Sequence, residues 1–279
     1  MPVIAMTQEM GSLAEDVALQ LAQAAGLAVM RHEVLENVAG KMHVQGSLIS
    51  RLREGKAGLV ERLSTDQKRV AIYTEQELYS QASRGNVVLR GWGATALLRA
   101  VPHVLTVRVT RAFGQRVDWL MDNLGTDDRS FAEAEVRRSD HAHSTRMNAL
   151  YGVTWGDPLL YDIVLNTDRL SIDSCVAVIQ QLAARPEFQE TEASRSMLAD
   201  LALTSQVRAA LKDQERTRDL RINIESSAGT VVLSGIVIND QERSAAEQAA
   251  ASATGVSRVD NQLRVMASNR RFASTDAKI

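Results

Sequence analysis

Residues 3–26 read VIAMTQEMGSLAEDVALQLAQAAG and set the fold of the first part of the chain. The run 3–6 is short and apolar, which is typical of a buried strand. Gly11 and Ser12 indicate a turn, and the helix that follows is ended by Gly26. The apolar face of this helix is formed by Leu13, Val17, Leu21 and Ala24. A strand, a turn and a helix in this order are how phosphate-binding α/β domains begin.

The following segments continue this alternation of apolar runs and helices. Because these runs are mainly apolar and do not alternate, buried strands are predicted over residues 87–89, 104–109 and 161–166. Helices are predicted over residues 32–43, 73–84, 112–123, 130–148 and 171–184. Ser130 and Glu133 have the spacing of a capping box, and residues 46–69 give no clear pattern. The whole indicates an α/β domain over residues 1–184, a parallel sheet with helices on both faces.

The last third of the chain has a different pattern. Residues 185–202 contain Pro186 and several Glu and Ser residues, and we interpret them as a linker. Residues 203–267 then predict the order α-β-β-α-β, with helices over 207–211 and 240–253 and alternating strands over 221–225, 231–238 and 259–265. Such a domain has helices on one face of its sheet. Residues 268–279 are expected to form a flexible tail.

Composition narrows the function. The chain has 279 residues and a formal net charge of −2, whereas a protein that binds nucleic acid through phosphate contacts is usually basic, so no nucleic-acid partner is expected. Cys175 is the single cysteine, which excludes an intrachain disulfide and a zinc site built on several thiolates. It lies in an apolar run, so a buried structural thiol is expected there.

The first residues give no sign of export. Residues 1–6 lack a basic segment and a long apolar segment, and no stretch approaches the ~20 apolar residues of a membrane span. We therefore expect a cytoplasmic protein.

Motifs between residues 87 and 171 identify a family resemblance. They are Gly91-Trp92-Gly93-Ala94, residues 102–109 (PHVLTVRV), Arg116, Asp140, residues 151–158 (YGVTWGDP) and residues 161–167 (YDIVLNT). The last two resemble the pattern G-V-D-W-x-D-P-x-x-Y-D-L-V-I-N-T of the cytidylate-kinase-like family. With the N-terminal strand, turn and helix, the resemblance covers about residues 1–184.

The resemblance implies a phosphate-loop fold with a five-stranded parallel sheet, a nucleoside-monophosphate site and a mobile lid. It also implies transfer of the γ-phosphoryl group of ATP, with Mg²⁺, to CMP or dCMP. The family's catalytic positions correspond to Arg108, Arg116, Arg137 and Arg138, and its cofactor-binding loop to Thr7, Gly11 and Ser12. Substrate contacts are implied for Gly91, Trp92, Gly93, Asp140 and Asp162, and no protein-held metal is implied.

The sequence departs from the family pattern where phosphate would bind. The family's loop reads Ser-x-x-x-Gly-Ser-Gly-Gly-Arg, and here the last three positions are Leu13, Ala14 and Glu15, with no lysine in the loop. Trp92 and His143 stand where the family has arginines. Phosphoryl transfer depends on positioning and on cationic charge, so these changes predict a nucleotide-binding domain that is degenerate in catalysis. The alternative is an active kinase that uses an unusual loop.

A second resemblance covers residues 203–267. Residues 229–235 (GTVVLSG), 242–246 (ERSAA) and 255–263 (GVSRVDNQL) resemble the three motifs of a BON domain, in the right order. BON domains are associated with envelope proteins and with binding of phospholipid or macromolecules. This segment has eight basic and eight acidic residues, which does not favour an anionic membrane. A protein partner or self-association is expected, and an envelope-associated module with a vestigial kinase fold is a further alternative.

Several of these features also have a plain structural interpretation. Gly11 and Ser12 could form only a turn and a helix cap. Trp92 could pack between sheet and helix. His141 and His143, two residues apart on a helix, are expected to point in different directions and to be solvated.

Overall fold

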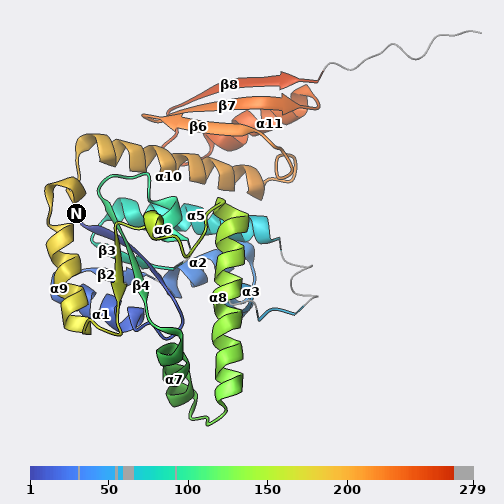
Figure 1. Cartoon of the computed structure of the whole chain (residues 1–279). Coiled ribbons are helices and arrows are strands. Elements are labelled where there is room, and N and C mark those ends of the chain that lie inside the picture. The colour runs from blue at the N-terminus through green and yellow to red at the C-terminus, as the bar shows by residue number, and fades with distance from the viewer. Residues whose placement is uncertain (31, 54–55, 59–65, 92, 267–279) are drawn as a thin grey trace, which may run out of the picture. The chain divides into compact units, whose positions relative to one another are not determined.

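The structure is a computed structural model of the whole chain, and it describes residues 1–30, 32–53, 56–58, 66–91 and 93–266 (Figure 1). The chain divides into two compact units, residues 1–202 and the residues from Leu203 onward. Each unit has its own hydrophobic core.

The first unit is built on a five-stranded sheet in the order β2-β3-β1-β4-β5. Its strands are β1 (Val3–Gln8), β2 (Ala28–Met30), β3 (Val87–Arg90), β4 (Val104–Thr110) and β5 (Ile163–Asn166). All neighbouring pairs are parallel, and Val3 of β1 is in register with Val87 and Val104. The carboxyl ends of the strands therefore meet at one edge of the sheet.

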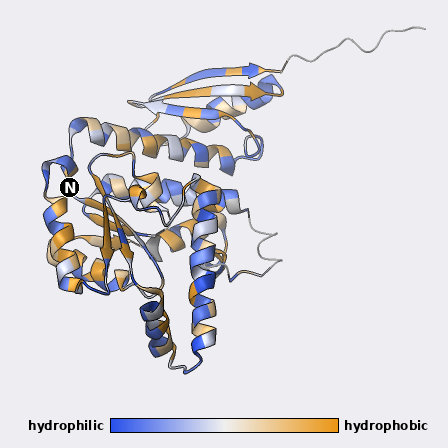
Figure 2. Cartoon of the chain, in the orientation of Figure 1, coloured by the Kyte–Doolittle hydropathy of each residue, from blue (hydrophilic) through white to orange (hydrophobic). Residues whose placement is uncertain are grey.

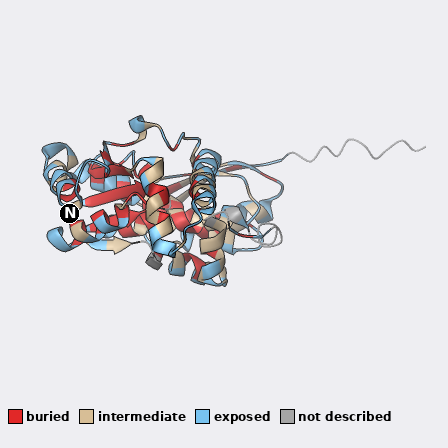
Figure 3. Ribbon diagram, turned by 60° about the horizontal axis from the view of Figure 1, so that its bottom comes forward, coloured by how far each residue is buried: buried red, intermediate tan, exposed pale blue. Residues whose placement is uncertain are grey.

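Helices α1 (Ala14–Ala25) and α9 (Ile172–Ala183) pack against each other and on one face of the sheet. Their buried residues include Val17, Leu21, Cys175 and Ile179, which contact strand residues such as Leu105. The strands are apolar in Figure 2 and largely buried in Figure 3, in agreement with the uninterrupted apolar runs of the sequence. Cys175 is a buried free thiol, and burial raises its pKa, as expected of a structural cysteine.

The other helices of this unit are α2 (His32–Met42), α3 (Gly46–Arg53), α5 (Gln67–Arg84), α6 (Ala94–Leu97), α7 (Phe113–Leu124) and α8 (Arg129–Tyr151). Short 3₁₀ turns occur at η1 (Pro158–Leu160) and η2 (Pro186–Phe188). Helix α5 contacts β3, and α6 contacts β1. Helices α7 and α8 lie side by side and are joined by a short connection (Figure 1).

Two details of the first unit differ from the sequence analysis. The capping box at Ser130 is wrong, because α8 begins at Arg129 and the side chain of Asp128 accepts a hydrogen bond from the Phe131 amide (2.9 Å). Strand β2 was not predicted, because it is only three residues long and none of them is fully buried. Such a short, half-exposed strand carries little periodic signal.

The second unit has a three-stranded sheet in the order β6-β7-β8. Strand β6 (Asn223–Ser227) is antiparallel to β7 (Thr230–Val237), and β8 (Arg258–Val265) is parallel to β7. Helix α11 (Asp240–Ala251) and the end of α10 (Glu192–Asp213) complete a core that includes Leu203, Val207, Val231, Leu233, Ala246 and Leu263. The predicted order α-β-β-α-β is therefore present.

Most of the segment interpreted as a linker is regular structure. Residues 186–188 form η2, and α10 begins at Glu192 and continues past residue 202 without a break. Among the described helices, none is long and apolar enough to cross a bilayer.

Candidate functional site

The loop between β1 and α1 lies at the carboxyl edge of the sheet. Gly11 has φ +75° and Leu13 has φ +59°, so both residues are in the left-handed region. For Leu13 this conformation costs roughly 1 kcal/mol, which a glycine would avoid. A Cβ on Gly11 would lie 2.9 Å from the carbonyl oxygen of Arg116, so the loop is held close to α7. The loop thus keeps a glycine-like backbone although it has lost glycines.

Glu9 is the centre of the contacts at this edge. Arg108 Nη2 donates to Glu9 Oε1 at 2.6 Å, and Thr110 Oγ1 donates to Glu9 Oε2 at 2.7 Å. The Arg111 amide donates to the same Oε2 at 3.3 Å, and Arg116 Nε lies 3.6 Å from it. We call Glu9, Arg108, Thr110, Arg111 and Arg116 the Glu9 cluster.

Arg116 connects this cluster to α8. Its two terminal nitrogens donate to the two carboxylate oxygens of Asp140 at 2.9 and 2.7 Å. Burial opposes the charge on Arg116, but the hydrogen bonds and charge of Asp140, with the charge of Glu9, outweigh burial and raise the Arg116 pKa. Arg116 is therefore fixed as a cation between the loop and α8.

Arg108 is held by aromatic residues on its other side. Its Nη1 donates to the Trp155 carbonyl at 2.8 Å, and its guanidinium lies 4.4 Å from the Trp155 ring centroid. Trp155 Nε1 donates to Thr7 Oγ1 at 3.0 Å, and His143 stacks on the Trp155 ring. Burial raises the pKa of Tyr161, against the effect of nearby Arg108, and the Tyr161 hydroxyl donates to the Trp155 carbonyl. The predicted Thr7 and Arg108 are thus brought together, although by an indole and not by a ligand.

A second acidic residue of the loop region, Glu15, faces Arg90. Arg90 Nη2 lies 3.2 Å from Glu15 Oε2, and the Arg90 side chain is buried at the end of β3. The negative charge that Glu15 brings to the loop is thus paired with this arginine.

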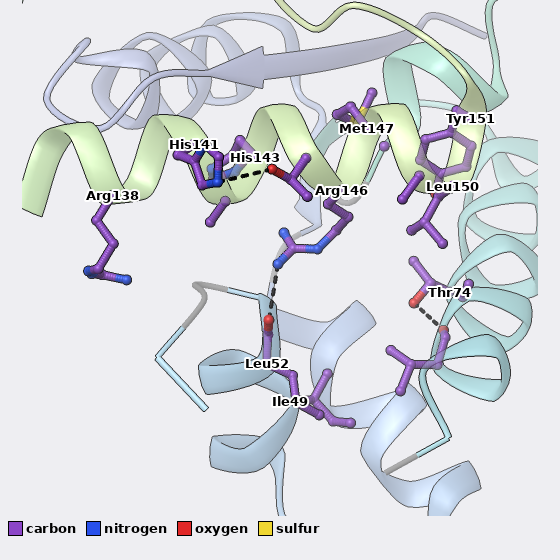
Figure 4. A pocket seen from close by; sticks show the side chains of 16 residues that line it. Ile49, Leu52, Thr74, Arg138, His141, His143, Arg146, Met147, Leu150 and Tyr151 are labelled. Atoms are coloured by element: carbon purple, nitrogen blue, oxygen red, sulfur yellow. Dashed lines mark hydrogen bonds between the residues drawn. The ribbon is translucent and has the colours of Figure 1, made fainter. Parts of the chain in front are cut away.

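The α8 pocket is a separate cavity of about 460 Å³ between α3, α5 and α8 (Figure 4). Arg138, His141, His143 and Arg146 of α8 lie along its wall. The rest of the labelled lining is Met147, Leu150 and Tyr151 of α8, with Ile49, Leu52 and Thr74. Arg146 Nη2 donates to the Leu52 carbonyl at 3.0 Å, which connects α8 to α3. Among the described residues that line the pocket, none is acidic.

Most of the predicted site residues lie at two places, the Glu9 cluster and the α8 pocket. Gly11, Ser12, Thr7, Arg108, Arg116 and Asp140 lie at or beside the Glu9 cluster. Gly93 and Arg138 line the α8 pocket, where His141 and the half-buried His143 also lie, so His143 is not the solvated residue expected. Gly91 donates its amide to the Met6 carbonyl, at the carboxyl end of β3. Trp92 lies outside the described residues.

Two predicted residues have other contacts. Arg137 lies over the Phe113 ring at 4.3 Å and is exposed. Asp162 precedes β5 and accepts hydrogen bonds from the amide and hydroxyl of Thr106, both at 2.7 Å, which fastens β5 to β4. Their roles toward a ligand remain predictions.

Sequence reasoning missed Glu9 and Arg90. The signal for Glu9 was its place directly after a buried strand and before Gly11-Ser12, where ligand-binding side chains gather in parallel sheets. Arg90 was hidden because a charged residue at the end of an apolar run is commonly solvated, whereas here it is 3% exposed.

A triphosphate with Mg²⁺ fits this loop poorly. Glu9 occupies the nearest guanidinium groups, and no lysine stands in the loop. No group of three or more His, Cys, Asp or Glu side chains that could hold a metal is found in the described part of the chain. One observation favours a polar ligand: Ser12 Oγ is buried and has no hydrogen-bond partner among the described residues.

A family model described as "Cytidylate kinase-like family" matches residues 3–169, more than half of the chain. The chain belongs to the cytidylate kinase-like family. A second model, "BON domain", matches residues 199–267. Both resemblances seen in the sequence are confirmed.

Several known proteins are similar to this chain. A protein named "Cytidylate kinase" from Staphylothermus marinus is 21% identical over 160 residues, which are 56% of this chain and 89% of the relative. The crystal structure of an uncharacterized protein from Eubacterium ventriosum has a TM-score of 0.53 and 19% identity, over 66% of this chain and all of the other. A shikimate kinase from Bacteroides thetaiotaomicron has a TM-score of 0.41 and 15% identity, over 65% and 97% of the two chains. The residues that match the family model, 3–169, lie in the first unit, which therefore has the phosphate-loop kinase fold of this family.

Proposed function

We propose that the first unit binds a nucleoside monophosphate in the α8 pocket and is degenerate in phosphoryl transfer, and that the BON domain couples it to a partner or to other copies of itself. The observation that carries the proposal is the Glu9 carboxylate on Arg108 and Arg116. Both guanidinium groups that could contact a transferred phosphoryl group are already neutralised by the chain's own carboxylates, Glu9 and Asp140.

The α8 pocket suits a nucleotide. A volume of about 460 Å³ lies within the usual range for small-ligand sites, and its lining combines apolar side chains with Arg138 and Arg146. Two arginines and two histidines lie on one wall, which suits a phosphate monoester because guanidinium groups bind such oxyanions in bidentate fashion. Arg138 already pairs with Glu135 of its own helix at 2.7 Å, so Arg146 is the arginine tested below. Helix α8 supplies the basic residues and part of the apolar lining, and α3 and α5 supply further apolar residues, so base and phosphate would have separate contacts.

The sequence of the loop between β1 and α1 favours the proposal that phosphoryl transfer is weak. Phosphoryl transfer needs cations on the β- and γ-phosphates, and a well-placed arginine contributes ~10³-fold or more. Here the loop offers Leu13, Ala14 and Glu15, and Glu9 competes for the nearby arginines. Loss of these cationic contacts would together reduce turnover to a small fraction of that of a normal kinase.

The test has two measurements on the full chain. Calorimetric titration with CMP and dCMP should give binding with a Kd between about micromolar and millimolar. A turnover assay with labelled ATP, Mg²⁺ and each monophosphate should give acceptor-dependent ADP at least ~10³-fold below the 1–100 s⁻¹ of typical kinases. Absence of binding by any nucleoside monophosphate contradicts the proposal.

A pair of variants locates the binding. Arg146→Met removes a pocket guanidinium and should weaken CMP binding about tenfold, because a charged hydrogen bond contributes more than 1 kcal/mol. Arg84→Met is the matched control, since Arg84 is exposed at the end of α5 and does not line the pocket. Equal losses in the two variants would place binding elsewhere.

The second candidate is an active cytidylate kinase, favoured by the relative from Staphylothermus marinus that carries this name. Stoichiometric conversion of CMP or dCMP at an ordinary kinase rate would establish it. Loss of that turnover in Arg116→Met would then assign the chemistry to the Glu9 cluster.

For the BON domain, we propose a role in association. Ile236 and Ile238 are 64% and 68% exposed beside a groove of about 530 Å³ at the end of β7. Exposed aliphatic side chains of this size on one strand end favour contact with another surface. Sedimentation of the full chain and of the double variant Ile236→Ser, Ile238→Ser would test it. Self-association should be weaker in the variant, whereas a monomer in both samples would reject self-association through this surface.

A further inference from the structure

Four donors converge on one carboxylate in the Glu9 cluster. They are a guanidinium nitrogen of Arg108, the hydroxyl of Thr110, the amide of Arg111 and Nε of Arg116, at 2.6, 2.7, 3.3 and 3.6 Å. They come from β4, the residue after it, and α7. Guanidinium, hydroxyl and backbone amide donors aimed at one point are the groups that recognise an oxyanion.

The Glu9 carboxylate leaves one of these donors without a hydrogen bond. Arg116 Nε is buried, lies 3.6 Å from Glu9 Oε2 and has no hydrogen-bond partner among the described residues. The Arg116 side chain is only 6% exposed. A carboxylate has two oxygens in one plane, whereas a tetrahedral oxyanion has more acceptors in more directions.

The charges of the Glu9 cluster are balanced and largely shielded from solvent. The Glu9, Arg108 and Arg116 side chains are 12%, 7% and 6% exposed, so solvent screens them little. Glu9 and Asp140 together neutralise Arg108 and Arg116. An added phosphate would therefore bring uncompensated negative charge unless the Glu9 carboxylate left.

From these contacts we propose that Glu9 is a resident anion: its carboxylate fills an oxyanion site formed by Arg108, Thr110, the Arg111 amide and Arg116, and keeps phosphate-class anions out. The inference rests on the proposed function, because it names the residue that restrains the phosphate side of the same unit. Glu9 then has two effects. It stabilises the cluster without a ligand, and it competes with any phosphoryl group for the same donors.

The experiment removes the carboxylate and offers a replacement. Thermal unfolding of the full chain is measured for the wild type and Glu9→Ala, in inorganic phosphate and in sodium chloride of equal ionic strength. Glu9→Ala leaves two buried cations with one carboxylate, so its Tm in chloride should fall by roughly 5 °C or more. Phosphate should restore most of that loss in Glu9→Ala and should change the wild-type Tm little.

Glu15→Ala is the matched control. It removes the same charge from the same region, but Glu15 is 53% exposed and pairs with Arg90 outside the cluster. Phosphate should not stabilise Glu15→Ala beyond the wild type. Equal stabilisation of both variants would mean a general charge effect and would overturn the inference, as would a wild type that binds phosphate as tightly as Glu9→Ala.

A second variant covers the case in which Glu9→Ala does not fold in chloride. Glu9→Gln keeps the shape and one acceptor oxygen, and calorimetry should show phosphate binding at least about tenfold tighter than in the wild type. Glu9→Ala that folds only with phosphate present also supports the inference. No gain in phosphate binding by Glu9→Gln, with no rescue of Glu9→Ala, overturns it.

The outcome is separable from the proposed function. Phosphate rescue is measured without nucleotide, whereas CMP binding to the α8 pocket is measured on the wild type. Rescue with no CMP binding would retain the resident anion and reject the nucleotide site. CMP binding without rescue would retain the nucleotide site and reject the role of Glu9.

Discussion

The Glu9 cluster and the α8 pocket both present arginines, but the two sets differ in burial and in access to a cavity. In the Glu9 cluster the guanidinium groups of Arg108 and Arg116 are almost fully buried and paired with carboxylates. In the α8 pocket Arg138 and Arg146 border a cavity that no described acidic residue lines, and Arg138 is 31% exposed and pairs with Glu135 of its own helix at 2.7 Å. The difference teaches that two of the expected catalytic residues, Arg108 and Arg116, are tied into the fold by buried ion pairs, whereas the arginines of the pocket border open space.

The largest expected effect breaks the Glu9 cluster. Arg108→Met keeps much of the side-chain volume but removes the charge that Glu9 faces at 2.6 Å. Breaking a buried ion pair from one side typically costs about 3–5 kcal/mol. Urea unfolding should show this loss, while Arg137→Met, whose exposed guanidinium lies over Phe113, should cost less than about 1 kcal/mol. Similar small losses in both would mean that Arg108 is not the structural residue described here.

The next effect tests the connection between the cluster and α8. Asp140→Asn weakens two charged hydrogen bonds to Arg116, and we expect a loss of about 2 kcal/mol in the free energy of unfolding. The same change should lower the Arg116 pKa, because the charge and hydrogen bonds of Asp140 are what outweigh burial. Unchanged unfolding in urea would show that the pair contributes nothing net.

A comparison of two glycines tests whether the pocket wall affects ligand binding. Gly91 and Gly93 both have left-handed backbones, with φ of +78° and +79°. A Cβ on Gly93 would lie 2.6 Å from the Tyr151 hydroxyl oxygen, whereas a Cβ on Gly91 would meet no described atom within 4 Å. Both alanine variants carry the same backbone strain, so their difference reports the displacement of Tyr151 in the pocket wall. We expect Gly93→Ala to bind CMP about tenfold more weakly than Gly91→Ala. Equal affinities would mean that Tyr151 does not contribute to CMP binding.

The smallest expected effect concerns the loop itself. Leu13 adopts a left-handed conformation at the N-cap of α1 and makes no side-chain capping bond. Asparagine tolerates this conformation and is a favoured N-cap, so Leu13→Asn should stabilise the fold by about 0.5–1 kcal/mol. Leu19→Asn, on the exposed face of α1, is the control and should be neutral or slightly destabilising. Destabilisation by Leu13→Asn would mean that apolar contacts of Leu13 outweigh the strain.

The sequence was sufficient for the sheet and helices because their signals are local and periodic. Mainly apolar runs predicted β1, β3 and β4, and the helical spacing of Leu13, Val17, Leu21 and Ala24 predicted α1. The strand β2 escaped because three residues carry no period, and α8 was started too late because Asp128 competes with Ser130 as a cap. Local signals decide helix ends only when one candidate cap stands alone.

The site could be predicted only in part. Motifs brought Arg108, Arg116 and Asp140 to one place, and the structure agrees that they are neighbours of the loop. Their partner Glu9 could not be found from spacing, because its contacts are about 100 residues away in the chain. Likewise, the α8 pocket depends on the approach of α3 to α8 through Arg146 and Leu52, 94 residues apart.

Helix α10 has a practical consequence for dividing this chain. Leu198 is buried before residue 202, and Leu203 and Val207 are buried after it, on one uninterrupted helix. A fragment cut at the boundary between the units would end or begin in mid-helix, with backbone groups that no cap satisfies. Expression of either unit by itself should therefore keep residues 192–213 whole, at the cost of exposing apolar side chains from the half that belongs to the other core.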